Sequence, residues 1–172
     1  MAKKTKVNAS RRNFLFGAVR RLKGEEVGDG PIAATTETIP LLTRANGHYA
    51  AGEYEEATEA YREYLKIEKN DLDVRLQLGK CMYAAGKYAA SRVEFKRVLK
   101  VREKDSEAIV YLGLTHARNG NLEQAAAAWE DFFDISNVAL LRELNLQKGL
   151  IETRDAESPE LVAEAVEKAL RG

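Results

Sequence analysis

The chain has 172 residues, of which 45% are hydrophobic and 31% charged, and this balance is typical of one ordinary folded unit with a tail. A single cysteine, Cys81, excludes an internal disulfide framework, and no run of 18 or more apolar residues predicts a membrane-spanning helix. The 27 basic and 27 acidic side chains cancel in number but are unevenly placed.

Residues 1–24 contain eight basic side chains and no acidic one, so the remaining 148 residues carry 19 basic and 27 acidic side chains. Such a basic arm can contact phosphate, lipid or an acidic protein surface. We expect residues 1–37 to form this arm, with a short amphipathic helix over about 10–23 and a flexible linker after it. The arm residues expected to make contacts are Arg11, Arg12, Phe14, Leu15, Arg20 and Arg21.

A repeat begins after the arm. Gly52, Gly86 and Gly120 are spaced 34 residues apart, each in a similar phrase, such as Ala-Gly-Glu-Tyr-Glu-Glu-Ala at 51–57 and Ala-Gly-Lys-Tyr-Ala-Ala-Ser at 85–91. A fixed period of this length is typical of a stacked array of helical hairpins, in which each unit buries its apolar face against its neighbours.

Each repeat is expected to hold two helices, one on either side of its glycine. Asp71 and Ser158 are predicted N-caps, the latter followed by Pro159, and Asn121 is expected to cap a helix while Gln124 reaches back to it. The expected helices span about 39–50, 54–68, 72–84, 88–102, 107–118, 122–134, 138–152 and 159–170.

This pattern resembles the tetratricopeptide repeat. The second repeat shows it best, and the third continues it through Trp129 to Phe133. The family's small residues let paired helices approach closely, a role that falls to Ala45, Gly79 and Gly113 here. The matching residues of the second repeat are Leu78, Gly79, Tyr83, Gly86, Tyr88, Ser91, Phe95 and Leu99, and Tyr61, Phe95 and Trp129 are expected to fill the space between units.

The resemblance implies an all-α fold, a right-handed superhelical stack of antiparallel helix pairs. The repeats are 38–71, 72–105 and 106–139, and a degenerate C-terminal helix pair follows at 138–170, all within a domain of residues 38–172. The last pair is degenerate because Arg154 stands where a fourth turn glycine is expected. The family's frequent helix-ending proline is also missing, since Lys69, Glu103 and Asn137 occupy its positions.

In this family the first helices of successive repeats line a concave groove that holds a protein or peptide. The chaperone-carboxylate specialisation is rejected, because Leu42, Leu76 and Val110 stand where it needs polar or basic side chains. An alternative is that the lining packs against the fourth and fifth helices or a second copy of the chain. The groove residues that the resemblance implies are Leu42, Asn46, Tyr49, Leu76, Lys80, Tyr83, Val110, Leu114 and Arg118.

The expected function is therefore that of a cytoplasmic adaptor or scaffold, with the arm tethering it to a membrane or membrane complex. Two alternatives stay open. Ser10-Arg11-Arg12-Asn13-Phe14-Leu15 resembles the twin-arginine export motif, which would place the protein in a periplasm, although the apolar stretch that follows is short. In the other, the arm fills the groove of a neighbouring copy and the chain forms a homo-oligomer.

Nothing in the sequence indicates an enzyme, a cofactor or a metal site. His48 and His116 lie two periods apart, which favours core positions over a ligand pair, and no His or Asp is arranged around Cys81 in the sequence. Nucleic acid is a disfavoured partner, because the acidic body would repel a phosphate backbone.

Overall fold

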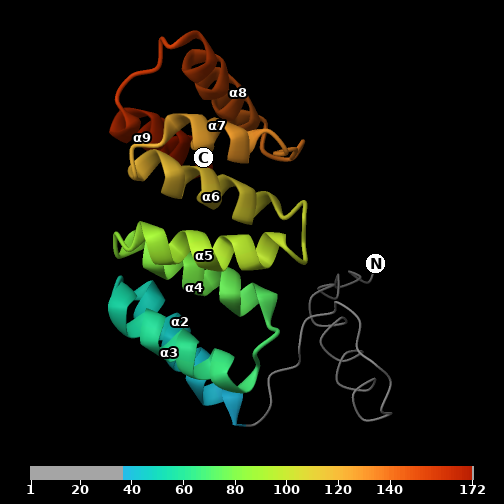
Figure 1. Cartoon of the computed structure of the whole chain (residues 1–172). Helices are drawn as coiled ribbons and strands as arrows, with labels where there is room; N and C mark the ends of the chain where they lie inside the picture. Colours follow the sequence, from blue (N-terminus) through green and yellow to red (C-terminus); the bar gives the residue numbers. More distant parts are fainter. Residues whose placement is uncertain (1–36, 172) are drawn as a thin grey trace, which may run out of the picture.

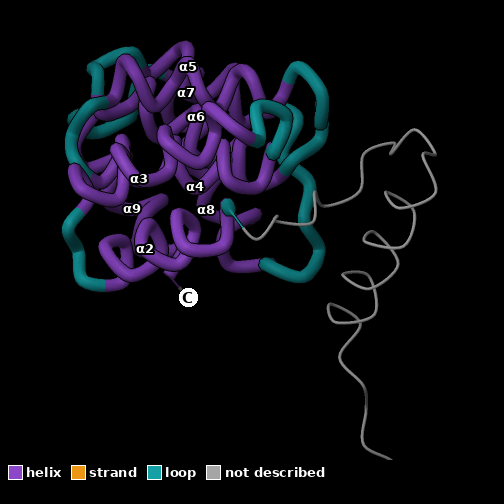
Figure 2. The backbone as a smooth tube through the Cα atoms, turned by 90° about the horizontal axis from the view of Figure 1, so that it is seen from below, coloured by secondary structure: helices purple, strands orange, loops and turns teal. Residues whose placement is uncertain are grey.

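The computed structural model describes residues 37–171, and within that range the chain forms eight helices and no strand. Consecutive helices pack in pairs, and the pairs stack one upon the next in Figure 1. Figure 2 shows the loops that join them. The predicted all-α stack is confirmed. The helices are α2 (Thr38–Ala50), α3 (Tyr54–Ile67), α4 (Leu72–Ala84), α5 (Tyr88–Leu99), α6 (Ser106–Arg118), α7 (Leu122–Trp129), α8 (Val138–Thr153) and α9 (Pro159–Arg171).

Aspartates begin the first helices of the second and third repeats. The carboxylate of Asp71 accepts a hydrogen bond from the backbone N–H of Val74 at 3.0 Å, as predicted, and that of Asp105 accepts one from Ala108 at 2.9 Å. Each bond satisfies a donor that the first turn of a helix leaves without an intrahelical partner. Asn121 does not cap α7 through its side chain, so that prediction is wrong; its amide instead donates to the carbonyl of Asn119 at 3.1 Å.

The turn between paired helices has one geometry throughout the stack. Gly52, Gly86 and Gly120 have φ values of 78°, 72° and 77°, in the left-handed region that glycine adopts without steric cost. The residue after each glycine donates to a carbonyl five residues earlier, at 2.8–2.9 Å. This pair of features is the Schellman ending of an α-helix.

The fourth turn keeps this geometry without glycine. Arg154 has a φ of 63°, and its N–H donates to the carbonyl of Ile151 at 3.2 Å. The N–H of Asp155 donates to the carbonyl of Leu150 at 2.9 Å, as the equivalent residues do in the other three turns. The period of 34 residues therefore extends through the end of α8, although the expected glycine is absent.

Close helix approach depends on small residues, as predicted. A Cβ at Gly79 would lie 2.7 Å from the ring of Phe95, and one at Gly113 would lie 2.0 Å from the indole nitrogen of Trp129. The hydroxyl of Ser91 donates to the carbonyl of Gly79 at 2.8 Å. These contacts join α4 to α5 and α6 to α7, with both aromatic rings fully buried.

Two of the second helices end earlier than predicted. α5 ends at Leu99 and α7 at Trp129, where the sequence indicated 102 and 134. Beyond α7, the carboxylate of Asp134 accepts hydrogen bonds from the N–H and hydroxyl of Ser136 at 2.8 and 2.6 Å, a local turn that competes with the helix. Phe133, expected to continue the packing ladder, is therefore 73% exposed, and Phe132 is buried instead.

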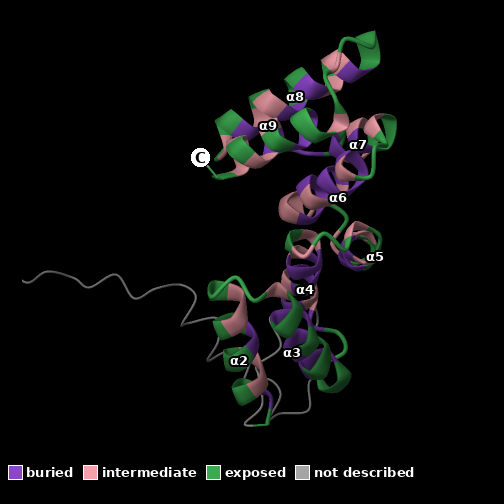
Figure 3. Cartoon of the chain, turned by 90° about the vertical axis from the view of Figure 1, so that its left-hand side faces the viewer, coloured by how far each residue is buried: buried purple, intermediate pink, exposed green. Residues whose placement is uncertain are grey.

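The last helix does not continue the stack. α8 packs against α7, but α9 turns back and packs against both α8 and α6. In Figure 3, α9 lies on the same side of the stack as α2, so the chain curves around α4 and α6. Val162, Ala163 and Val166 of α9 are buried in one cluster with Val110 and Leu114 of α6.

The arm lies outside the described residues, including the helix expected over 10–23 and all six of its contact residues. None of the helices within 37–171 is both long enough and apolar enough to cross a lipid bilayer.

Candidate functional site

The first helices, α2, α4 and α6, form the inner side of the curve, where the groove was expected (Figure 3). On α2, Asn46 is exposed, and Leu42 and Tyr49 are partly buried. The ring of Tyr49 meets that of Tyr54 edge-on, with centroids 5.8 Å apart. The side-chain oxygen of Asn46 accepts a hydrogen bond from the hydroxyl of Tyr61 at 2.5 Å. This bond holds the Asn46 amide at the surface of α2.

On α4, Lys80 extends across to the next repeat. Its ammonium nitrogen lies 2.5 Å from a carboxylate oxygen of Glu107 and 5.6 Å from the ring centroid of Tyr111. Both partners belong to α6, so one lysine joins the first helices of two repeats by an ion pair and a cation–π contact. Leu76, also predicted to line the groove, is 6% exposed and packs with Phe95, Val98 and Ala108. Leu76 is therefore a core residue between repeats.

Tyr83 is the centre of an aromatic cluster. Its ring centroid lies 5.4 Å from that of Tyr88 and 5.5 Å from that of Tyr111, which in turn stacks on Phe95. The hydroxyl of Tyr83 donates to the carboxylate of Glu167 on α9. The expected anchor residue is thus already in contact with another part of the chain.

The α6 part of the expected groove is covered. Val110 and Leu114 are 1% and 0% exposed beneath α9, and Arg118 is held by Glu167 through bonds of 2.8 and 3.1 Å. The expectation that these three residues line an open groove is corrected, because α9 lies where a ligand was expected. The alternative reading named the fourth and fifth helices or a second copy of the chain, whereas the helix that covers these residues is α9.

The tyrosines of this face are neutral hydrogen-bond donors. Burial raises the pKa of Tyr83, and its bond to Glu167 raises it further. Burial likewise raises the pKa values of Tyr49 and Tyr111. The charge of Lys80 lowers the pKa of Tyr49, and that of Glu107 raises it.

The described residues hold no cluster of three or more His, Cys, Asp or Glu side chains that could bind a metal ion. Cys81 is fully buried, and burial raises the pKa of its thiol to about 12, which suppresses the nucleophilic thiolate. His116 is buried in the core, as its place in the repeat predicted. His48 is partly exposed and lies 2.6 Å from the carboxylate of Glu53.

The face is thus a surface of fixed aromatic and polar side chains, and the family model for the tetratricopeptide repeat matches residues 48–109. Residues 48–109 are therefore identified as tetratricopeptide repeat sequence. The match runs from the last turn of α2 into the first turn of α6. No curated protein matches the chain.

The tetratricopeptide repeat assignment explains which site residues sequence reasoning found and which it missed. Asn46, Tyr49, Lys80 and Tyr83 were predicted by carrying the family's groove positions over onto each repeat. Glu167 was missed, because its role depends on α9 turning back across α6, which no periodic signal encodes. The signal that could have pointed to it was the apolar stripe of α9 combined with its flanking acids.

Proposed function

We propose that this protein is an adaptor that binds a segment of a partner protein on the inner face of α2 and α4. Leu42, Asn46, Tyr49 and Lys80 form this binding face. It offers two apolar anchors, a fixed amide and a cation, which suits a helical or extended peptide with a few apolar side chains. The tetratricopeptide repeat supports the general role, because such repeats mediate protein–protein interactions.

One observation carries the proposal. The equivalent face of the third repeat, formed by Val110, Leu114 and Arg118, already accepts an amphipathic helix, which is α9. That helix inserts small apolar side chains and presents a carboxylate to the arginine. Because the repeats share one backbone geometry, the same type of ligand suits the corresponding positions of α2, which no helix of residues 37–171 covers from the inner side.

Site-specific photocrosslinking tests this proposal. A benzophenone amino acid is placed at position 46 or 49 in the native host, and at position 56 on the exposed side of α3 as a control. We expect a discrete adduct from 46 and 49 that is absent from 56. Mass spectrometry of the adduct identifies the partner. Equal crosslinking from position 56, or none from 46 and 49, would refute the proposal.

The eight basic residues of the arm support a second element of the function, contact with an anionic membrane or membrane complex through Arg11, Arg12, Arg20 and Arg21. Flotation with phosphatidylglycerol vesicles tests it by comparing the whole chain with one that starts at residue 38. Equal flotation argues against membrane contact. N-terminal sequencing of the mature protein tests twin-arginine export, and size-exclusion chromatography of the same two proteins tests arm-dependent self-assembly.

A further inference from the structure

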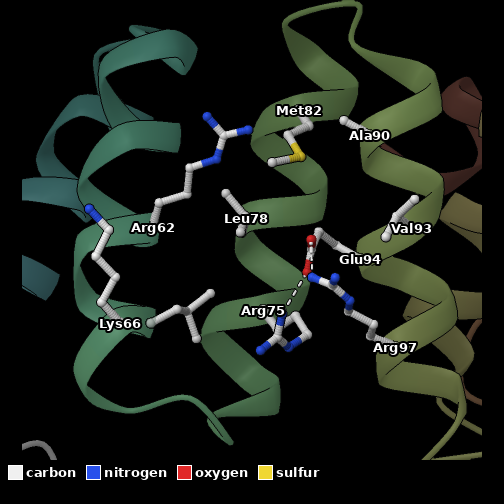
Figure 4. Close-up of a pocket in the computed structure, with 10 residues that line it drawn as sticks. Arg62, Lys66, Arg75, Leu78, Met82, Ala90, Val93, Glu94 and Arg97 are labelled. Atoms are coloured by element: carbon white, nitrogen blue, oxygen red, sulfur yellow. Dashed lines mark hydrogen bonds and ion pairs between the residues drawn. The ribbon is translucent and has the colours of Figure 1, made fainter.

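A hollow lies away from the inner face, between α3 and α5 over the middle of α4. We call it the α3–α5 pocket; its volume is about 400 Å³. Figure 4 shows Arg62 and Lys66 on one side, Val93 and Arg97 on the other, and Leu78 between them. The full lining is Arg62, Leu65, Lys66, Arg75, Leu78, Met82, Ala90, Val93, Glu94 and Arg97.

The floor of the α3–α5 pocket is apolar. Leu65, Leu78 and Met82 are core residues that also line the hollow, and Val93 is 45% exposed at its edge. A methionine thioether adapts its shape to what packs on it. Burying the side chain of a leucine or phenylalanine on this floor would remove apolar surface of both molecules from water.

The rim of the α3–α5 pocket is basic. It holds four cationic side chains and one acid, Glu94. Glu94 is already paired, because it accepts from Arg75 at 2.7 Å and from Arg97 at 2.8 Å. Arg75 is fixed in place, because it also donates to the carbonyl of Lys69 at 2.7 Å. The net charge of the lining is therefore +3.

Two rim cations, Arg62 and Lys66, are fully available to a ligand, and Arg97 is available in part. The side chain of Arg62 is 46% exposed, and its partner Glu59 is 70% exposed, so this ion pair is weak and readily exchanged. Lys66 is exposed and forms no ion pair within residues 37–171. Arg97 is 58% exposed and can share its remaining donors with a ligand while it keeps its bond to Glu94.

This basic rim contrasts with the surrounding body. Residues 37–171 carry 19 basic and 24 acidic side chains, a net charge of −5. The lining is thus positive on a body whose net charge is negative, and this charge favours carboxylates. The acidic body would repel the extended phosphate backbone of a nucleic acid, and an apolar floor gives such a ligand nothing to bury.

We propose that the α3–α5 pocket binds an acidic segment of a partner protein. The segment places one leucine- or phenylalanine-sized side chain on Leu78, Met82 and Val93. Its flanking carboxylates pair with Arg62 and Lys66. This site is separate from the inner face, so a single chain can hold two different polypeptides.

The probe is a fluorescein-labelled synthetic peptide, Glu-Glu-Leu-Glu-Glu, titrated with the full chain and followed by fluorescence anisotropy. We expect binding that weakens with salt and that falls when the leucine is replaced by serine or the glutamates by glutamines. Methionine labelled with ¹³C at its methyl group locates the ligand, because the chain has only two methionines and Met82 is the one in the pocket. Its signal should move, and an unmoved Met82 signal would place the peptide elsewhere.

Matched variants decide whether the rim is responsible. The double variant Arg62→Glu with Lys66→Glu should weaken binding of the peptide by about tenfold or more. The double variant Arg142→Glu with Lys168→Glu makes the same charge change on exposed positions of α8 and α9. It should leave the affinity for the peptide within about twofold of the unmodified chain's. Circular dichroism melting checks that both variants are folded. If both double variants lost affinity equally, the effect would be explained by net charge, and the proposal would be overturned.

Two further results would also overturn it. In the first, single-stranded DNA binds more tightly than the peptide, and this binding is lost in the Arg62→Glu, Lys66→Glu variant. That result would assign the pocket to nucleic acid. Peptide binding that occurs only after Glu25→Gln, Glu26→Gln and Asp29→Asn would assign it to the chain's own acidic stretch. The crosslinking at positions 46 and 49 reports on the other face, so failure of one proposal leaves the other testable.

Discussion

The backbone of Gly113 lies directly against the indole of Trp129. A Cβ at position 113 would sit 2.0 Å from the indole nitrogen, which donates to the carbonyl of Val110 at 3.1 Å. The tryptophan can make this bond only because residue 113 has no side chain. Packing of α6 on α7, and hence the third repeat, depends on this one absent methyl group.

Gly113→Ala should therefore destabilise the fold strongly, by about 3 kcal/mol, because the ring and the backbone must move apart and the buried hydrogen bond is lost. Gly149→Ala is the matched control, since Gly149 lies within α8 and a Cβ added there would meet no atom within 4 Å. It should stabilise by about 0.5–1 kcal/mol through helix propensity. Urea denaturation measures both, and similar values would contradict the packing argument.

The left-handed backbone of the fourth turn predicts that two substitutions change stability in opposite directions. Arg154→Gly removes left-handed strain of about 1 kcal/mol and should leave stability unchanged or slightly raised. Gly120→Ala, at the same place in the preceding turn, introduces that strain and should lower stability by about 1 kcal/mol. Thermal melts of the two variants provide the comparison. A clear loss for Arg154→Gly would show that the arginine side chain has a role of its own.

We expect the hydrogen bonds of Glu167 to be the polar contacts that contribute most to holding α9 against α4 and α6. Glu167→Ala leaves Tyr83 and Arg118 partly buried without their shared acceptor, so we expect a loss of about 1–3 kcal/mol. Glu164→Ala is the control, because Glu164 is 60% exposed and 4.0 Å from Arg118. Hydrogen exchange should quicken in α9 and the adjoining side of α6, with α2 unaffected. Uniform quickening would mean that α9 unfolds only with the whole stack.

Cys81 should resist thiol reagents in the native protein. It is fully buried with a pKa raised to about 12, so at pH 8 only about one molecule in ten thousand carries a thiolate. Ellman's reagent should react at least about a hundredfold faster in urea than in buffer. Because the chain has one cysteine, the signal reports on α4 alone. Rapid native labelling would indicate that the second repeat opens locally.

His116 should make stability depend on pH. Burial lowers its pKa, nearby Arg92 and Lys96 lower it further, and within residues 37–171 its Nδ1 atom has no hydrogen-bond partner. The unfolded chain therefore binds a proton at higher pH than the folded chain, and the free energy of unfolding falls as pH drops from about 7 to about 5. His116→Gln should flatten this slope in urea titrations. An unchanged slope would assign the pH dependence to other groups.

The helices could be predicted because their signals are local. The limits of α4 follow from Asp71, the apolar spacing and the glycine at 86, and all three lie within or beside the helix. The end of α7 could not be read in this way. The register favoured Phe133 as the packing residue, but the turn of Asp134 and Ser136 ends the helix first and leaves Phe132 in the core.

For the proposed binding face, only the placement of its residues in the stack can be compared with the prediction. The family resemblance, carried over repeat by repeat, predicted that Asn46, Tyr49 and Lys80 lie on one side of the stack. It could not show that Val110 and Leu114 are buried, since their environment is set by a helix about 50 residues further along the chain. Local periodicity describes each hairpin, whereas the fold-back of α9 is a contact between distant segments.

The fold-back of α9 also limits how the molecule can grow. In an open array, a duplicated hairpin can be added after the last unit, because its end surface is ready to receive another. Here α9 occupies the inner side of α6, so lengthening at this end would require the terminal helix to be displaced. A longer version of the chain is therefore expected to gain its additional unit internally, before residue 106, with the α8–α9 closure carried along intact.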